Sequence, residues 1–141
     1  TPEVRESSGH LKLCVLESVV KDKRIVLVDD SIVRGTTIAN LIHMLKEAGA
    51  KEVHVRISSP PFLHPCYFGT DVPSNDQLIA ASHSTEEICK MIGADSLGYM
   101  QTDYLEGMAG GLPLCKACFD GNYPMELPDY TNAEVADIVK W

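Results

Sequence analysis

Long hydrophobic runs are missing from this sequence of 141 residues. Its longest apolar runs, such as Ile25–Val28, are far too short to span a membrane. The start shows no charged-then-apolar signal segment, so we expect a cytoplasmic location. Basic residues are few: 12 lysines and arginines stand against 20 aspartates and glutamates, and the net charge is −8. This balance argues against a nucleic-acid-binding surface and against an anionic-membrane surface.

The acidic balance is nevertheless compatible with an anionic small ligand, because backbone N–H groups in a local pocket bind phosphate even in an acidic protein. Apolar residues make up 45% of the chain and charged residues 23%, as in an ordinary folded domain. The sequence shows no internal repeat and no low-complexity stretch. The length fits one domain.

Residues 24–57 predict a strand, a loop, a helix and a second strand, which together make one βαβ unit. The apolar run that starts at Arg24 is typical of a strand buried on both faces of a parallel sheet. The helix is expected to be capped by Thr36 or Thr37 and to end at Gly49. Its apolar face has helical spacing: Ile38, Leu41, Ile42 and Leu45.

The other segments give shorter patterns. In chain order we expect a strand or pair of strands over 11–20, an extended proline-rich loop over 60–73, capping boxes at Ser74–Gln77 and Ser84–Glu87 that each open a short helix, a short strand over 95–100, a flexible turn over 107–111 and an amphipathic helix over 132–141.

Two adjacent acids, Asp29 and Asp30, stand at the end of the first predicted strand, where open α/β sheets bind ligands. Carboxylates accept hydrogen bonds from ribose hydroxyls and bind the Mg²⁺ that accompanies pyrophosphate. The loop 31–37 then leads into a helix N-terminus, whose free N–H groups attract phosphate. Gly35 lets a ligand approach the backbone closely. The segment therefore predicts a site for a ribose 5-phosphate.

Other interpretations of this segment exist. A hydrophobic strand that ends in two acids also occurs as a Walker-B strand and as the acidic cluster of receiver domains. No GxxxxGK[ST] loop accompanies it here, so the nucleoside-triphosphatase interpretation lacks its main part. A merely capped helix explains Thr36, Thr37 and Gly49, but it leaves the two acids without a role.

The segment 26–37, VLVDDSIVRGTT, resembles the fingerprint of type I phosphoribosyltransferases. Its SIVRGTT portion is similar to one branch of them, the glutamine phosphoribosylpyrophosphate amidotransferases. The resemblance continues to about Asp129 through several further motifs: AGAKEVHVRISSPP, HPCYFGTD, Gln77–Ala80, IGADSLGY, and Cys115-x-x-Cys118-Phe119 with Gly121-x-Tyr123-Pro124.

This resemblance implies a fold and a set of site residues. The fold would be α/β: a partial type I phosphoribosyltransferase fold with a mostly parallel sheet (residues 1–113), followed by a small cysteine-bearing segment and tail helix (114–141). Asp29 and Asp30 would bind the ribose hydroxyls and Mg²⁺ as catalytic residues. Arg5 and Lys12 would also be catalytic residues and would lie near the pyrophosphate. The residues of the 5-phosphate loop would be Ser31, Ile32, Val33, Arg34, Gly35, Thr36 and Thr37.

The implied activity is that of a pentosyl transferase of purine nucleotide biosynthesis. It forms 5-phosphoribosylamine and pyrophosphate from phosphoribosyl pyrophosphate and ammonia derived from glutamine. The family carries a glutaminase domain with an N-terminal cysteine nucleophile, which the present sequence does not show. We therefore expect a fragment that is inactive by itself. The resemblance also implies purine nucleotides as feedback ligands and a homo-oligomer, with no nucleic acid or membrane partner.

Close-spaced cysteines, Cys115 and Cys118, are compatible with zinc, a redox dithiol or an iron–sulfur cluster. For zinc, His64 and Cys66 would complete the ligand set. The family resemblance implies a 4Fe–4S cluster held by Cys66, Cys115 and Cys118, with the fourth cysteine outside this chain. Two further cysteines match no family ligand, and we expect them to be buried: Cys14 and Cys89.

Two alternatives to an enzyme stay open at this point. A ligand-sensing regulatory module with the same fold would keep the sugar-phosphate pocket but would act on nucleic acid, which the lack of a basic face disfavours. A small iron–sulfur or zinc protein would explain the cysteines and would leave Asp29, Asp30 and the loop after them unused.

Overall fold

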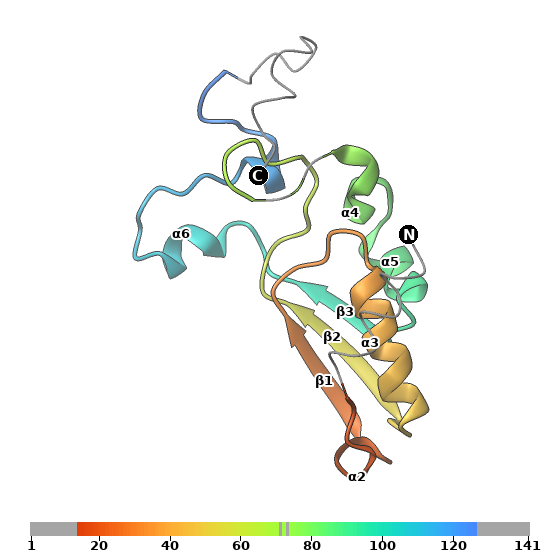
Figure 1. The fold of residues 1–141 in the computed structure, drawn as a ribbon. Coiled ribbons are helices and arrows are strands. Elements are labelled where there is room, and N and C mark those ends of the chain that lie inside the picture. Colours follow the sequence, from red (N-terminus) through yellow and green to blue (C-terminus); the bar gives the residue numbers. More distant parts are fainter. Residues whose placement is uncertain (1–13, 71, 73, 127–141) are drawn as a thin grey trace.

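A three-stranded parallel sheet is the centre of the computed structural model, which describes residues 14–126 except 71 and 73 (Figure 1). Its strands are β1 (Arg24–Asp29), β2 (Glu52–Ile57) and β3 (Ser96–Tyr99), in the order β1-β2-β3. The helical segments are α2 (Glu17–Val20), α3 (Thr36–Glu47), the 3₁₀ helix η1 (Asn75–Gln77), α4 (Ile79–Ser82), α5 (Thr85–Met91), α6 (Tyr104–Met108) and α7 (Ala117–Asp120).

The β1–α3–β2 unit confirms the predicted βαβ unit. Strand β1 pairs with β2 in parallel along its whole length, from Arg24 opposite Glu52 to Asp29 opposite Ile57. Helix α3 crosses between them, and Gly49 follows its end at φ +90°, a conformation that glycine adopts without strain. The third strand also lies where the pattern predicted it, parallel to β2.

One face of the sheet carries the main hydrophobic core. Val53, Val55 and Ile57 of β2 are almost completely buried. They pack against the apolar faces of α3 and α5, which lie on the same side of the sheet (Figure 1). The helix residues at the centre of this cluster are Ile38, Ile42, Leu45 and Ile88.

The prediction that β1 is buried on both faces is wrong for the part of the chain that the structure describes. Val26 and Val28 are 63% and 68% exposed, whereas Ile25 and Leu27 on the other face pack into the core. The reason is that, among the described residues, the helices that pack on the sheet cover the face of Ile25 and Leu27 and leave the face of Val26 and Val28 open. The composition of the strand could not reveal which face would be covered.

Three local predictions are also wrong. Residues 17–20 form helix α2 rather than a strand, and an ion pair between Lys21 and Glu17 spans its one turn at 2.9 Å. Within 107–111, residues through Met108 belong to helix α6, which ends before two glycines with positive φ. Ser74 makes no side-chain cap, because Gln77 turns its amide toward Arg34 instead.

The capping box at the start of α5 is confirmed. The Ser84 hydroxyl accepts from the Glu87 amide at 3.3 Å, and the Glu87 carboxylate accepts from the Ser84 amide at 2.8 Å. The hydrogen bonds that the Glu87 carboxylate accepts from the Ser84 amide and the Ser84 hydroxyl hold the pKa of Glu87 below its usual value. The N-terminus of α5 thus has a side-chain hydrogen-bond acceptor for its free amides, whereas the N-terminus of α3 has none.

A second, smaller cluster lies beyond the carboxyl ends of the strands. Phe62, Val72 and Leu78 are its buried members, and Val33, Cys66, Cys118 and Phe119 pack against them. The carbonyl of Cys118 accepts hydrogen bonds from the amides of Leu63 and His64, at 2.9 and 3.0 Å, and so ties α7 to the proline-rich loop. The proposed boundary at residue 113 stays a prediction, as does the tail helix over 132–141, which lies outside the described residues.

None of the described helices combines the length and the apolar character that crossing a bilayer requires.

Candidate functional site

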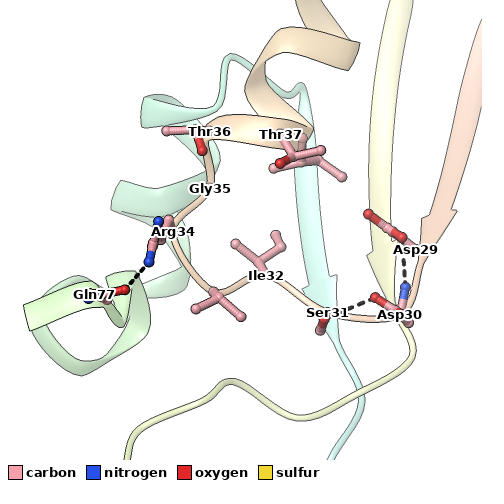
Figure 2. Close-up of a pocket in the computed structure, with 11 residues that line it drawn as sticks. Asp29, Asp30, Ser31, Ile32, Arg34, Gly35, Thr36, Thr37 and Gln77 are labelled. Atoms are coloured by element: carbon pink, nitrogen blue, oxygen red, sulfur yellow. Dashed lines mark hydrogen bonds between the residues drawn. The ribbon is translucent and has the colours of Figure 1, made fainter. Parts of the chain in front are cut away.

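A pocket of about 570 Å³ opens beyond the carboxyl end of β1 (Figure 2). Its lining is the continuous stretch from Asp29 to Ile38, together with Gln77 from η1. All of the residues predicted to bind the sugar and its phosphate, 29–37, therefore line one cavity. Such a position, at the carboxyl ends of parallel strands, is where open α/β sheets bind ligands.

Hydrogen bonds of the backbone fix the position of the two acids at the strand end. The carbonyls of Asp29 and Asp30 accept hydrogen bonds from the amides of Ser58 and Ser59, each at 3.0 Å, just after β2. Asp29 accepts a hydrogen bond from the Asp30 amide at 2.9 Å, and Asp30 accepts one from the Ser31 hydroxyl at 2.9 Å. Both carboxylates are thus placed at the pocket with acceptor capacity remaining for a sugar hydroxyl or a cation.

Helix α3 begins at this pocket without a side-chain cap. Its N-cap residue is Gly35 at φ +82°, and no side chain accepts from the first turn. The amide of Ala39 donates to the Gly35 carbonyl at 3.0 Å, as the geometry of an α-helix requires, so the amides before it have no acceptor within the helix. The prediction that Thr36 or Thr37 caps the helix is therefore wrong, since both lie inside its first turn.

Gly35 is needed for two independent reasons. Its positive φ is costly for any residue with a side chain. A Cβ atom at this position would also lie 3.1 Å from Cδ1 of Ile79 and 3.5 Å from Cγ2 of Ile92. The loop can thus bring its main chain against α4 only because residue 35 has no side chain.

Two loop residues serve the scaffold with their side chains. Ile32 is 2% exposed and belongs to the main core, and Val33 packs against the second cluster. They anchor the loop at both clusters and leave only their main-chain atoms for a ligand. Ser31, Thr36 and Thr37 are partly or fully exposed, and their hydroxyls lie in the lining of the cavity.

Gln77 is the lining residue that sequence reasoning missed. Its side-chain carbonyl accepts a hydrogen bond from the Arg34 guanidinium (Figure 2). The pattern Ser74-x-x-Gln77 assigned this side chain to a helix cap, which hid its other use. Nothing short of the tertiary structure could reveal the pairing, because the two residues are 43 positions apart.

The pocket carries an acidic and a basic end. Asp29 and Asp30 lie at one end of the loop and Arg34 lies toward the other (Figure 2). Two adjacent carboxylates without a lysine or arginine beside them in this lining fit a divalent cation, since Mg²⁺ binds through one or two carboxylates and the phosphates of its ligand. The residues predicted to face the pyrophosphate, Arg5 and Lys12, lie outside the described residues.

The cysteines come from two separate segments. Cys66 and Cys118 pack into the second cluster, whereas Cys115 is exposed. Burial raises the pKa of the Cys118 thiol to about 11, and the nearby Cys66 and Cys115 also raise it. Burial also opposes ionisation of Cys66, but the backbone amides of Phe68, Thr70 and Gly69 outweigh it and lower the pKa of that thiol.

Cys66 and Cys115 are close enough to Cys118 to raise its pKa, but the three do not form a complete ligand set. Over 14–126, apart from 71 and 73, no group of three His, Cys, Asp or Glu side chains is arranged to hold a metal ion. The iron–sulfur cluster therefore stays a prediction. The two remaining cysteines differ from the expected burial to different extents: Cys14 is exposed, so the expectation is wrong there, and Cys89 is half-buried.

Comparison with known proteins identifies several relatives. Residues 2–58 match the family model described as the phosphoribosyl transferase domain. The amidophosphoribosyltransferase of Pyrococcus horikoshii is 56% identical over 123 residues, which are 87% of this chain and 27% of that protein. The corresponding protein of Archaeoglobus fulgidus is 51% identical over 132 residues, 89% of this chain and 28% of that protein.

A solved structure gives the same result. The glutamine phosphoribosylpyrophosphate amidotransferase of Bacillus subtilis, complexed with ADP and GMP, superposes with a TM-score of 0.75 at 44% identity. The match covers 92% of this chain and 30% of that one. The chain thus spans about a quarter to a third of the length of the relatives that it matches.

Proposed function

We propose that this chain, which belongs to the amidophosphoribosyltransferase family over the region that it spans, binds the ribose 5-phosphate part of phosphoribosyl pyrophosphate. The observation that carries the proposal is the single pocket that unites two strand-end acids with an uncapped helix N-terminus. The acids suit the sugar hydroxyls, and the free amides suit the phosphate.

The complete reaction would replace pyrophosphate at C1 of the sugar by ammonia derived from glutamine, to give 5-phosphoribosylamine for purine synthesis. Departure of pyrophosphate leaves positive charge on the ribose ring, and Asp29 and Asp30 stand at the pocket end where they would stabilise that charge. Mg²⁺, when bound by these carboxylates, would neutralise the leaving pyrophosphate. The first-turn amides of α3 would hold the 5-phosphate still while the bond at C1 breaks.

Purine nucleotides are the proposed regulatory ligands, because the Bacillus subtilis relative was solved with ADP and GMP. A nucleoside monophosphate carries the same ribose 5-phosphate group as the substrate, so it would compete for the same amides and acids.

We also propose a homo-oligomer, and a cytoplasmic location, which the free state of all five cysteines supports.

A 4Fe–4S cluster is the proposed use of Cys66, Cys115 and Cys118, with a fourth ligand outside this chain. The closeness of Cys66 and Cys115 to Cys118, whose pKa both raise, supports this proposal. The amides around Cys66 would stabilise its thiolate and would equally stabilise a sulfur bound to iron.

Isothermal titration of the complete protein with ribose 5-phosphate, in the presence of Mg²⁺, tests the central proposal. We expect saturable binding that disappears in the double variant Asp29→Asn, Asp30→Asn. Ribose without phosphate should bind far more weakly, because it cannot use the amides of α3. Equal binding of ribose and ribose 5-phosphate would sink the assignment of the loop to phosphate.

A further inference from the structure

Arg34 is the basic residue of the described pocket lining, and its position determines the electrostatic potential that an anion meets in this pocket. The lining otherwise carries two negative charges, on Asp29 and Asp30. A phosphate approaching the loop would meet a net negative charge unless a cation screens the acids or the guanidinium faces it. Arg34 is also exposed, so its long side chain would lose conformational freedom whenever it is held in place.

The η1–α4 segment supplies the restraint. The Arg34 guanidinium donates a hydrogen bond to the side-chain oxygen of Gln77 in η1. This contact does not stand alone, because the Ile79 amide donates to the Val33 carbonyl at 2.9 Å. The Ile79 side chain lies so close to Gly35 that a Cβ atom there would be 3.1 Å from its Cδ1, and Leu78 is 1% exposed within the second cluster. The segment is therefore hydrogen-bonded to the pocket loop at residues 33 and 34 and lies close beside it at residue 35.

We propose that Gln77 is a positioning residue of this pocket, which holds the Arg34 guanidinium at its wall so that the positive charge is ready for the phosphate of the ligand. The inference rests on the proposed function, since it assumes that the loop binds a sugar phosphate. It extends that function to a segment that contributes no acid and no helix amide.

The Gln77 side chain is uncharged, and this matters as much as its ability to accept a hydrogen bond. A carbonyl oxygen fixes the guanidinium and leaves its full positive charge available to an anion. A carboxylate at the same position would hold the guanidinium equally well but would compensate its charge. The arrangement thus separates two effects, restraint and charge, that a single substitution at Arg34 would remove together.

The test is a double-mutant cycle in the complete protein, with inorganic phosphate and ribose 5-phosphate as titrants in the presence of Mg²⁺. Gln77→Ala should weaken both by about threefold to tenfold. Gln77→Glu should weaken the binding of both titrants at least as much. High salt should reduce the difference in affinity between this variant and the unchanged protein. Asn75→Ala, on the same 3₁₀ helix but outside the pocket lining, is the matched control and should bind normally.

The decisive variant is Arg34→Ala combined with Gln77→Ala. If Gln77 acts through Arg34, removing it from the Arg34→Ala protein should change the affinity no further. An additional loss in that background would overturn the proposal and assign Gln77 a direct contact with the ligand. Unchanged affinity of the single Gln77→Ala variant would overturn it as well.

A ligand-free measurement keeps the two proposals apart. In protein labelled with ¹⁵N-arginine, the Nε–Hε signal of Arg34, identified by its loss in Arg34→Lys, should report an ordered side chain that becomes mobile in Gln77→Ala and stays ordered in Gln77→Glu. If sugar phosphate fails to bind while this pattern holds, the proposed function fails and the restraint stands. If Arg34 is equally mobile in all three proteins, the restraint fails whatever the titrations give.

Discussion

Two regions of the molecule were predicted from short motifs: the pocket loop, residues 29–38, and the cysteine group, which is Cys66, Cys115 and Cys118. They differ in how they are assembled. The pocket loop is continuous in sequence, and all of it lines one cavity. The cysteine group joins two distant stretches, and Cys66 and Cys115 lie near Cys118 without forming a group of three metal ligands among the described residues.

This difference teaches where local sequence suffices. A strand end, a left-handed glycine and a helix start determine the course of the pocket loop within ten consecutive residues, so its residues meet whenever β1 and α3 form. The cysteines meet only if α7 packs on the proline-rich loop through Cys118 and Phe119. Their geometry is therefore more sensitive to the rest of the tertiary structure.

The two regions also contact the same hydrophobic cluster. Val33 of the pocket loop packs in the same cluster as Cys66 and Cys118. Substitutions in either region can accordingly test how independent they are, and their effects on the sugar-phosphate site should fall off with distance from it.

The largest effect on this site is expected from Asp30→Asn, which removes one of the two charges at the strand end while preserving its size. Turnover of the complete protein should fall about 100-fold or more, because an interaction made at the reacting sugar is lost. Steady-state kinetics measure it. Asp103→Asn, an exposed acid of the N-cap of α6, is the control and should leave turnover unchanged. Near-normal turnover of Asp30→Asn would remove this residue from the mechanism.

A smaller effect should follow from Gly35→Ala. The positive φ costs about 1–2 kcal/mol for a residue with a side chain, and the methyl group would meet Ile79 at 3.1 Å. Gly93→Ala is a matched control, since Gly93 has φ +73° and open space around it. Denaturant unfolding should show a larger loss of stability for Gly35→Ala, and ribose 5-phosphate affinity should fall in that variant alone. Equal results for the two glycines would refute the close approach of loop and α4.

The smallest effect on the sugar-phosphate site is expected from Cys66→Ser. Iron content after anaerobic reconstitution should drop sharply in this variant and stay unchanged in Cys89→Ser, because Cys89 belongs to α5 and donates to the Ala94 carbonyl. Ribose 5-phosphate affinity should change by no more than about twofold, as for a substitution one packing contact away from the loop. Iron that persists in Cys66→Ser, or stoichiometric zinc in the unchanged protein, would exclude the proposed cluster.

Much of the fold could be predicted because its signals are local. The helical spacing of Ile38, Ile42 and Leu45 and the alternation over β2 reflect how one element meets one core, and both are confirmed. The failures have a common cause as well. Val26 and Val28 look like core residues, yet they are exposed because the described helices pack on the other face of the sheet, and which face is covered depends on the whole tertiary structure.

By itself the sequence determined the order β1–α3–β2, the two acids at the strand end and the glycine where the loop turns left-handed, because each depends on backbone preferences of a few neighbouring residues. Only the tertiary structure decided that one sheet face is covered, that α3 begins without a cap, and that Gln77 reaches Arg34. These features depend on which segments pack together, and side chains far apart in the chain acquire partners only when the core brings them within contact distance.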